Sequence, residues 1–171
     1  MNKGIIKDSI EINSAIVNLS KTINQNFNHT PTDIITMNNA AKYFVEDLID
    51  ILDVDIRQQS LKFKNYNHST HSGEVCITKD IEYPIFDRNI ILADGMIISG
   101  STHFYLCNYL EQSKPKSISI ICIGIKPALV KHKLPDYYSL FEFNEEWIEG
   151  YGIGDGEYSS QKCLVDLKKY K

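Results

Sequence analysis

Residues 90–102 of this chain read Ile90-Ile91-Leu92-Ala93-Asp94-Gly95-Met96-Ile97-Ile98-Ser99-Gly100-Ser101-Thr102. The apolar start predicts a buried strand over residues 89–93. An acid, Asp94, follows at the carboxyl edge of that strand and begins a loop predicted over 94–101. A small, hydroxyl-rich segment then opens a helix predicted over 102–112. A strand, a loop and a helix in this order indicate an open α/β sheet, in which ligands bind beyond the carboxyl ends of the strands.

The remainder of the chain continues this alternation of strands and helices. Apolar spacing predicts helices over 5–27 and 40–52, and apolar runs predict strands over 34–37, 117–125, 138–143 and 163–165. Two partly alternating segments, 55–66 and 74–78, are candidate extended arms around the polar, flexible stretch 67–73. We therefore expect one α/β domain over residues 1–171, a mostly parallel sheet flanked by helices on both faces, with a small hood from the two ends of the chain.

Composition and charge exclude several classes of protein. The chain has 171 residues, 18 Lys+Arg against 22 Asp+Glu and a net charge of −4, which is unlike a protein that coats duplex nucleic acid. No apolar run approaches the roughly 18 to 20 residues that span a bilayer, and no signal peptide is visible. The four cysteines lie far apart without a CxxC pair, as in a reduced, cytoplasmic protein. We expect neither a nucleic-acid nor a membrane partner.

The segment Ser99–Thr102 has the composition of a phosphate-binding loop. The free N–H groups at a helix N-terminus attract anions, Gly100 lets the backbone approach a ligand closely, and the hydroxyl groups of Ser99, Ser101 and Thr102 can donate hydrogen bonds. Ser and Thr are also common helix N-caps. On this segment alone, both interpretations stay open.

With its neighbours, this stretch resembles the signature of the type I phosphoribosyltransferases, and among them the hypoxanthine-guanine enzymes. That signature is an apolar strand, two adjacent acids, two apolar residues, an Asp and then Thr-Gly-x-Thr; Ile98-Ser99-Gly100-Ser101-Thr102 occupies the last five places. The resemblance implies that Ser99, Gly100, Ser101 and Thr102 bind the 5′-phosphate. It also implies that Asp94 holds the ribose hydroxyl groups and a magnesium ion.

Three further stretches carry the resemblance along the chain. Ser72-Gly73-Glu74-Val75 is similar to the segment after the family's mobile catalytic loop, which would be residues 66–71 here. Lys126 matches the lysine that bonds the exocyclic oxygen of a 6-oxopurine. In the segment 147–152, Trp147 matches the aromatic residue that stacks on the purine, and the backbone of Ile148 would read the edge of the base.

The departures from the family pattern fall on catalytic positions. Ile98 replaces the Asp described as the general base, a kind of help worth about 10² to 10⁴ in rate. The acid pair is reduced to Asp94-Gly95, or to Ala93-Asp94 if one residue is inserted, so that Asp94 is its one remaining carboxylate in either alignment. The pyrophosphate loop, commonly Leu-Lys-Gly, aligns with Asn38-Asn39-Ala40 and has no cation.

The C-terminal motif is also incomplete. The Asp expected after Gly-Tyr-x-Leu falls on Gly154, with Asp155 one place late as a weak second candidate metal ligand, and the following Arg aligns near Ser160. His68, His71 and Glu74 have a spacing that could suggest a metal site, although a solvated polar loop explains them better. Alternating glycines over 150–156 lack the strand, turn and helix of a dinucleotide site.

The resemblance implies a homo-oligomeric phosphoribosyltransferase of purine salvage, and the departures from the family pattern predict that its activity is low. It would use magnesium and move the 5-phosphoribosyl group from its pyrophosphate ester to hypoxanthine or guanine. The alternative is a purine-nucleotide-binding module that has lost the transfer chemistry.

Overall fold

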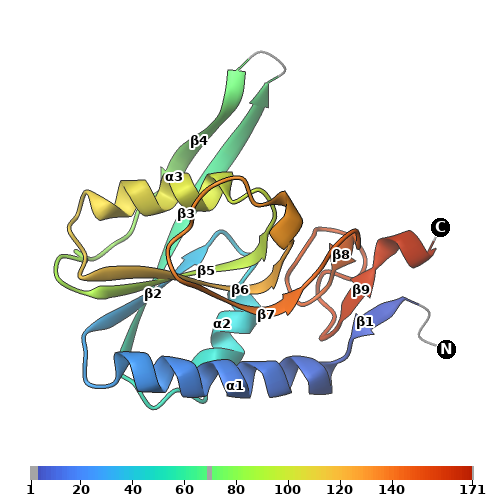
Figure 1. The fold of residues 1–171 in the computed structure, drawn as a ribbon, viewed down its shortest axis with the longest axis horizontal. Coiled ribbons are helices and arrows are strands. Elements are labelled where there is room, and N and C mark those ends of the chain that lie inside the picture. The colour runs from blue at the N-terminus through green and yellow to red at the C-terminus, as the bar shows by residue number, and fades with distance from the viewer. Residues whose placement is uncertain (1–3, 69–70, 171) are drawn as a thin grey trace.

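The structure, a computed structural model, describes residues 4–68 and 71–170, and the side chains of residues 65–74 and 170 lie outside the described part. Six strands form one sheet in the order β4-β3-β2-β5-β6-β7 (Figure 1). Neighbouring strands are parallel except for the antiparallel pair β3 and β4. The expected mostly parallel sheet is thus confirmed. The strands are β2 (Thr32–Met37), β3 (Ile56–His68), β4 (His71–Lys79), β5 (Asn89–Ile97), β6 (Ser117–Ile125) and β7 (Tyr137–Glu142).

Helices cover both faces of this sheet. Helices α1 (Ser9–Phe27) and α2 (Lys42–Ile49) lie on one face, and α3 (Ser101–Glu111) lies on the other (Figure 1). Successive residues of β5 divide between the two cores: Ile91 packs with the α1 and α2 side, whereas Ile90 packs with the α3 side. Apolar runs are needed in these strands because both faces are buried. None of the helices in the described part is long and apolar enough to cross a membrane.

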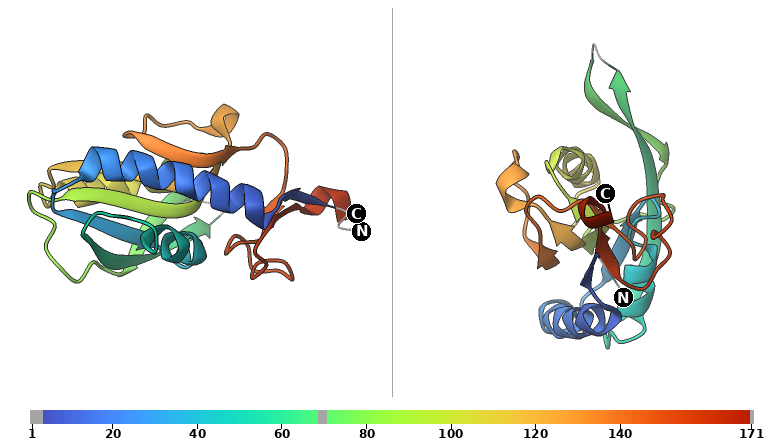
Figure 2. Two further views of the ribbon diagram at one scale, coloured as in Figure 1. Left: turned by 90° about the horizontal axis from the view of Figure 1, so that it is seen from below. Right: turned by 90° about the vertical axis from the view of Figure 1, so that its right-hand side faces the viewer.

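The two ends of the chain form a small second sheet, which we call the hood. Its strands are β1 (Ile5–Lys7), β9 (Leu164–Asp166) and β8 (Ile148–Glu149), in the order β1-β9-β8, and it lies beside one end of the main sheet (Figure 2). Short 3₁₀ helices, η1 (Pro127–Leu129) and η2 (Leu167–Tyr170), follow β6 and β9. The expected hood of N- and C-terminal parts is therefore present.

The first predicted helix begins later than its apolar spacing indicated. Residues 5–7 are a hood strand, and α1 starts at Ser9 because Asp8 caps it. The Asp8 carboxylate accepts hydrogen bonds from the amides of Ile10 and Glu11, and the Glu11 carboxylate accepts one from the Asp8 amide. This reciprocal capping box ends the extended chain and begins the helix.

Other predicted bounds differ by one or two residues, and three differences are larger. Strand β5 continues to Ile97 instead of ending at 93, since it keeps pairing with β6, and Asp94 therefore lies inside the strand, opposite Cys122. Helix α2 spans 42–49 instead of 40–52. The polar stretch 67–73 is mostly strand, because the two predicted arms pair as the long hairpin of β3 and β4; residues 69–70 lie outside the described part.

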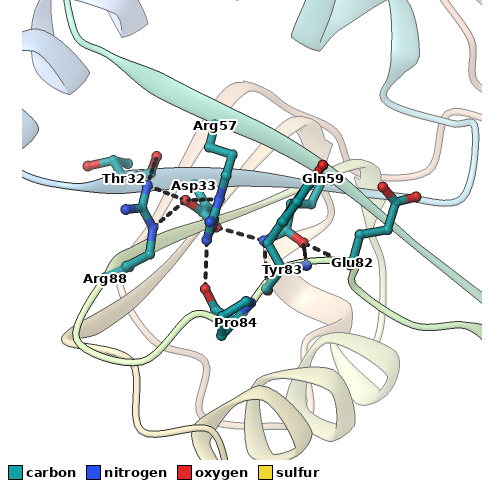
Figure 3. A network of polar contacts seen from close by, with 8 residues as sticks. All are labelled: Thr32, Asp33, Arg57, Gln59, Glu82, Tyr83, Pro84 and Arg88. Carbon is teal, nitrogen blue, oxygen red and sulfur yellow. Dashed lines mark hydrogen bonds and ion pairs between the residues drawn. The ribbon is translucent and has the colours of Figure 1, made fainter.

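A buried ionic network fixes the amino ends of the strands, at the edge opposite the carboxyl ends (Figure 3). Asp33 is fully buried, and its carboxylate lies 2.6 Å from the guanidinium groups of both Arg57 and Arg88. Gln59 donates to the same carboxylate at 2.7 Å, and its amide oxygen accepts from the amides of residues 82 and 83. The network ties β2, β3 and the segment before β5 together.

Candidate functional site

The segments that the sequence singled out meet at the carboxyl ends of three neighbouring strands. Strands β2, β5 and β6 lie side by side, so the residues that follow them, 38–41, 98–100 and 126, share one edge of the sheet. This is the edge at which open α/β sheets bind ligands. The sequence prediction of where the site lies is consistent with this arrangement.

The loop between β5 and α3 begins the helix through a glycine. Gly100 is the N-cap residue at φ +74°, in the left-handed region, and no side chain caps the helix. The ordinary Ser or Thr N-cap is therefore not what this segment forms. The Ser101 amide donates to the Ser99 hydroxyl at 3.3 Å, and that hydroxyl donates to the Ser101 hydroxyl at 3.1 Å. Ser101 itself is exposed. A compact, solvent-accessible hydroxyl cluster results.

Asp94 is paired with a residue that sequence reasoning did not single out. His103 is buried on the first turn of α3, and its Nε2 lies 3.0 Å from Oδ2 of Asp94. Nε2 makes no aligned hydrogen bond among the described residues, so the contact is one of proximity alone. The other oxygen of Asp94 accepts from the Gly95 amide at 2.7 Å. His103, Leu106, Cys107 and Leu110 share the inward face of α3, a spacing from which the burial of His103 could have been predicted.

A side chain at Gly95, the place aligned with the family's second acid, would be crowded and would require its neighbours to shift. A Cβ atom on Gly95 would lie 3.0 Å from Cγ1 of Ile153 and 3.1 Å from both the Cβ and the carbonyl oxygen of Ala40. Gly95 therefore packs closely against Ala40 of the predicted pyrophosphate loop. The place where a second carboxylate would stand is therefore crowded by Ile153 and Ala40.

The predicted purine-binding residues come together at the boundary between the main sheet and the hood. The Lys126 ammonium group donates to the carbonyl oxygen of Glu146 at 2.7 Å, directly before Trp147 in the chain. Trp147 is 67% exposed, which is unusual for a core tryptophan. Its amide donates to the Asp166 carboxylate, and the adjacent Ile148 lies in β8, paired with Asp166. The indole is thus a large, accessible face on a fixed backbone.

Three positions that depart from the family's pyrophosphate-binding pattern line one cavity. Its volume is about 330 Å³, and its lining includes Asn39, Gly154 and Ser160. Lys42, at the start of α2, also lines it, and it supplies a cation that the preceding loop over residues 38–40 does not contain. The remaining lining residues are Tyr43, Gly152 and Ser159.

The predicted site residues Ile98 and Asp155 both lie at the surface. Ile98 is 49% exposed and Asp155 is exposed. Among the described residues, no group of three or more His, Cys, Asp or Glu side chains could hold a metal ion. The backbone of Ser72 and Gly73 belongs to β4, while their side chains, like those of His68, His71 and Glu74, lie outside the described part. The loop expected over 66–71 is strand at 66–68 and at 71.

Comparison with known proteins agrees with this geometry. The sequence model of the phosphoribosyl transferase domain matches residues 4–155. The hypoxanthine-guanine phosphoribosyltransferase of Bacillus subtilis is 29% identical over 148 residues, covering 86% of this chain and 82% of the relative. The crystal structure of a hypoxanthine-guanine phosphoribosyltransferase from Bacillus anthracis, with HEPES in its active site, superposes with a TM-score of 0.90 at 25% identity, covering 96% and 98% of the two chains. A hypoxanthine phosphoribosyltransferase from Staphylococcus aureus shares the fold, with a TM-score of 0.89 at 20% identity over 95% and 89% of the chains.

Proposed function

This chain belongs to the phosphoribosyl transferase domain family, and we propose that it binds a 6-oxopurine nucleotide and makes it slowly from phosphoribosyl pyrophosphate and hypoxanthine or guanine. The observation that carries this proposal is that the Ser99–Thr102 loop and Lys126 follow the neighbouring strands β5 and β6 at one sheet edge. Lys126 in turn donates to the carbonyl oxygen of Glu146, the residue before the exposed Trp147. A phosphate, a polar base edge and an aromatic face are the contacts that a purine nucleotide needs.

Each part has a role in the proposed complex. The loop over Ser99–Thr102 binds the 5′-phosphate, and Asp94 holds the ribose hydroxyl groups. Lys126 exchanges the carbonyl oxygen of Glu146 for the exocyclic oxygen of the purine, and Trp147 stacks on the base. The backbone of Ile148 reads the remaining edge of the base.

The transfer forms a bond between purine N9 and ribose C1′ while the bond from C1′ to the pyrophosphate oxygen breaks. The purine also loses a proton, and Ile98 cannot accept it, so the proton passes to water. A missing general base costs about 10² to 10⁴ in rate. Positioning and charge stabilisation remain as the sources of catalysis. Low turnover follows, well below the ~1 s⁻¹ at the lower end for ordinary enzymes.

Magnesium would enter this site as part of the substrate. Mg²⁺ binds through one or two carboxylates together with substrate phosphates, and Asp94, whose Oδ2 lies beside His103, is the carboxylate that would hold it. When bound, the ion offsets negative charge on the phosphates. The cavity beside Asn39, Lys42 and Ser160 would receive the pyrophosphate, with Asp155 next to it along the chain from Gly154.

A second candidate function is supported by the crowding at Gly95. A chain that has no base at Ile98 and is crowded at the place of the second acid can still bind a nucleotide through its phosphate loop and Trp147. This alternative is a binding module for purine monophosphates.

Mass spectrometry of the reaction products separates the two functions. The protein is incubated for hours with magnesium, phosphoribosyl pyrophosphate and each of hypoxanthine, guanine, xanthine and adenine. Slow formation of one nucleotide is expected and would also name the base. No product, together with quenching of Trp147 fluorescence by a purine monophosphate, would establish the binding module.

We also propose that residues 1–171 fold as one domain and assemble as a homo-oligomer in the cytoplasm. One cooperative unfolding transition and a light-scattering mass above 19.6 kDa are the expected results.

A further inference from the structure

A histidine from a distant part of the chain reaches the predicted phosphate loop. The segment 130–134 follows η1 and lies against Gly100, where a Cβ atom would meet Leu134 at 3.3 Å and Val130 at 3.5 Å. The Lys131 amide donates to the carbonyl oxygen of Ser99 at 2.9 Å. These contacts attach the segment to the loop at its turn.

His132 is held directly beside the loop hydroxyl groups. Its Nε2 atom lies 3.0 Å from Oγ of Ser101. Its ring stacks on Phe104, with centroids 5.0 Å apart and an interplanar angle of 18°. His132 is half-buried and Ser101 is exposed, so a ligand at the loop can reach both groups.

The loop itself has no exposed cationic side chain. Residues 98–105 contain no lysine or arginine, and His103, the one histidine among them, is buried beside Asp94. His132 stands between two exposed lysines, Lys131 and Lys133. An imidazole becomes a double donor on protonation, and hydrogen bonds from a charged donor to phosphate are about twice as strong as neutral ones.

We propose that His132 is a phosphate-binding residue of this chain, which donates from Nε2 to the 5′-phosphate while the Ser101 hydroxyl turns from the imidazole to the same phosphate group. The inference rests on the proposed function, because it assigns a further residue to that site. It makes the site selective for phosphate monoesters over the corresponding nucleosides.

Isothermal titration calorimetry tests the assignment with three probes: GMP, guanosine and ribose 5-phosphate. His132→Phe keeps an aromatic ring to stack on Phe104 and removes the donor, and His132→Ala removes both. We expect both variants to lose about tenfold to hundredfold in affinity for GMP and ribose 5-phosphate, with guanosine unchanged. His29→Phe, which alters a histidine that lines the cavity beside Arg57 and Arg88, is the matched control and should bind like the wild type.

The outcomes distinguish the two proposals. Wild-type affinity for GMP in either His132→Phe or His132→Ala overturns the role of His132 as a donor and leaves the proposed function in place. If binding of ribose 5-phosphate depends on His132 and GMP binds no more tightly than ribose 5-phosphate, the role of His132 is supported and purine recognition is overturned. A wild-type protein that binds no phosphate ester overturns both.

Discussion

Oδ2 of Asp94 and Nε2 of His103 lie 3.0 Å apart, between the sheet and the first turn of the helix that follows it. The imidazole is 4% exposed and the carboxylate 16% exposed, so water screens the pair poorly. The one remaining acid of the family signature is therefore held by a neighbour nine residues along the chain. Its position is set by the packing of α3 on β5.

A double-mutant cycle should detect coupling between Asp94 and His103. We expect the free energies of unfolding of Asp94→Asn, His103→Leu and the double variant to be non-additive by about 0.5 to 3 kcal/mol, since the two side chains are in contact. Urea denaturation of the four proteins measures this. The control cycle combines Asp94→Asn with His29→Phe, and its free energies of unfolding should be additive. Additivity for Asp94 and His103 would show that their proximity has no energetic effect.

Returning the acid at position 98 should raise the rate of transfer. Ile98 is 49% exposed, so Ile98→Asp brings a carboxylate without burying it. We expect the initial rate of nucleotide formation to rise by about tenfold or more, because a proton acceptor is regained. Ile98→Asn has a similar shape and no basic oxygen, and it should stay at the wild-type rate. Equal rates for the Asp and Asn variants would favour the pure binding module.

Removing the charge of Asp33 should destabilise the protein strongly. Asp33→Asn leaves Arg57 and Arg88 beside a neutral amide, and breaking a buried ion pair from one side costs about 3 to 5 kcal/mol. Chemical denaturation should show a correspondingly lower free energy of unfolding. Asp55→Asn, at an exposed position, is the control and should change it little. A loss for Asp33→Asn as small as that of the control would contradict the role of the network (Figure 3).

Neutralising Glu149 should stabilise the protein. Glu149 is 4% exposed, and its Oε1 has no hydrogen-bond partner among the described residues. Transferring a carboxylate out of water without a partner costs more than transferring a neutral amide, so Glu149→Gln keeps the shape of the side chain and lowers the cost of burying it. The melting temperature should therefore rise, whereas Glu157→Gln, at an exposed position, should leave it unchanged. A lower melting temperature for Glu149→Gln would mean that the carboxylate is stabilised by an interaction beyond those described.

The cysteines should differ widely in reactivity. Burial raises the pKa of the Cys107 and Cys122 thiols to about 12, and the Glu111 carboxylate adds to the effect at Cys107. With a pKa this far above the solution pH, both thiols stay protonated at about pH 8. They are therefore unreactive, because only the thiolate is nucleophilic. We expect iodoacetamide to modify the exposed Cys76 first in the native protein, as measured by peptide mass spectrometry. Denaturant should make all four react, and native labelling of Cys122 at the rate of Cys76 would contradict its burial.

Local patterns of the chain were sufficient for much of the architecture. The apolar run 117–125 predicted β6 with its observed bounds, because a strand buried on both faces must be apolar along its whole length. The spacing of apolar residues likewise predicted α3 within one residue at each end. Motif order along parallel strands placed the loop 98–102 and Lys126 at one edge, since the carboxyl ends of neighbouring parallel strands coincide.

Contacts between distant segments needed the folded chain. The space beside Gly95 is crowded by Ala40 and Ile153, and no sequence pattern joins positions so far apart. His132 reaches Ser101 across 31 residues, through a segment whose path depends on how β6 and η1 end. Hydrophobic periodicity is a property of neighbouring residues, whereas the partners of a polar side chain depend on which surfaces pack together. The departures from the family pattern could be read from the sequence, but the contacts of Gly95 and His132 became visible only after the sheet, α3 and the hood had been assembled.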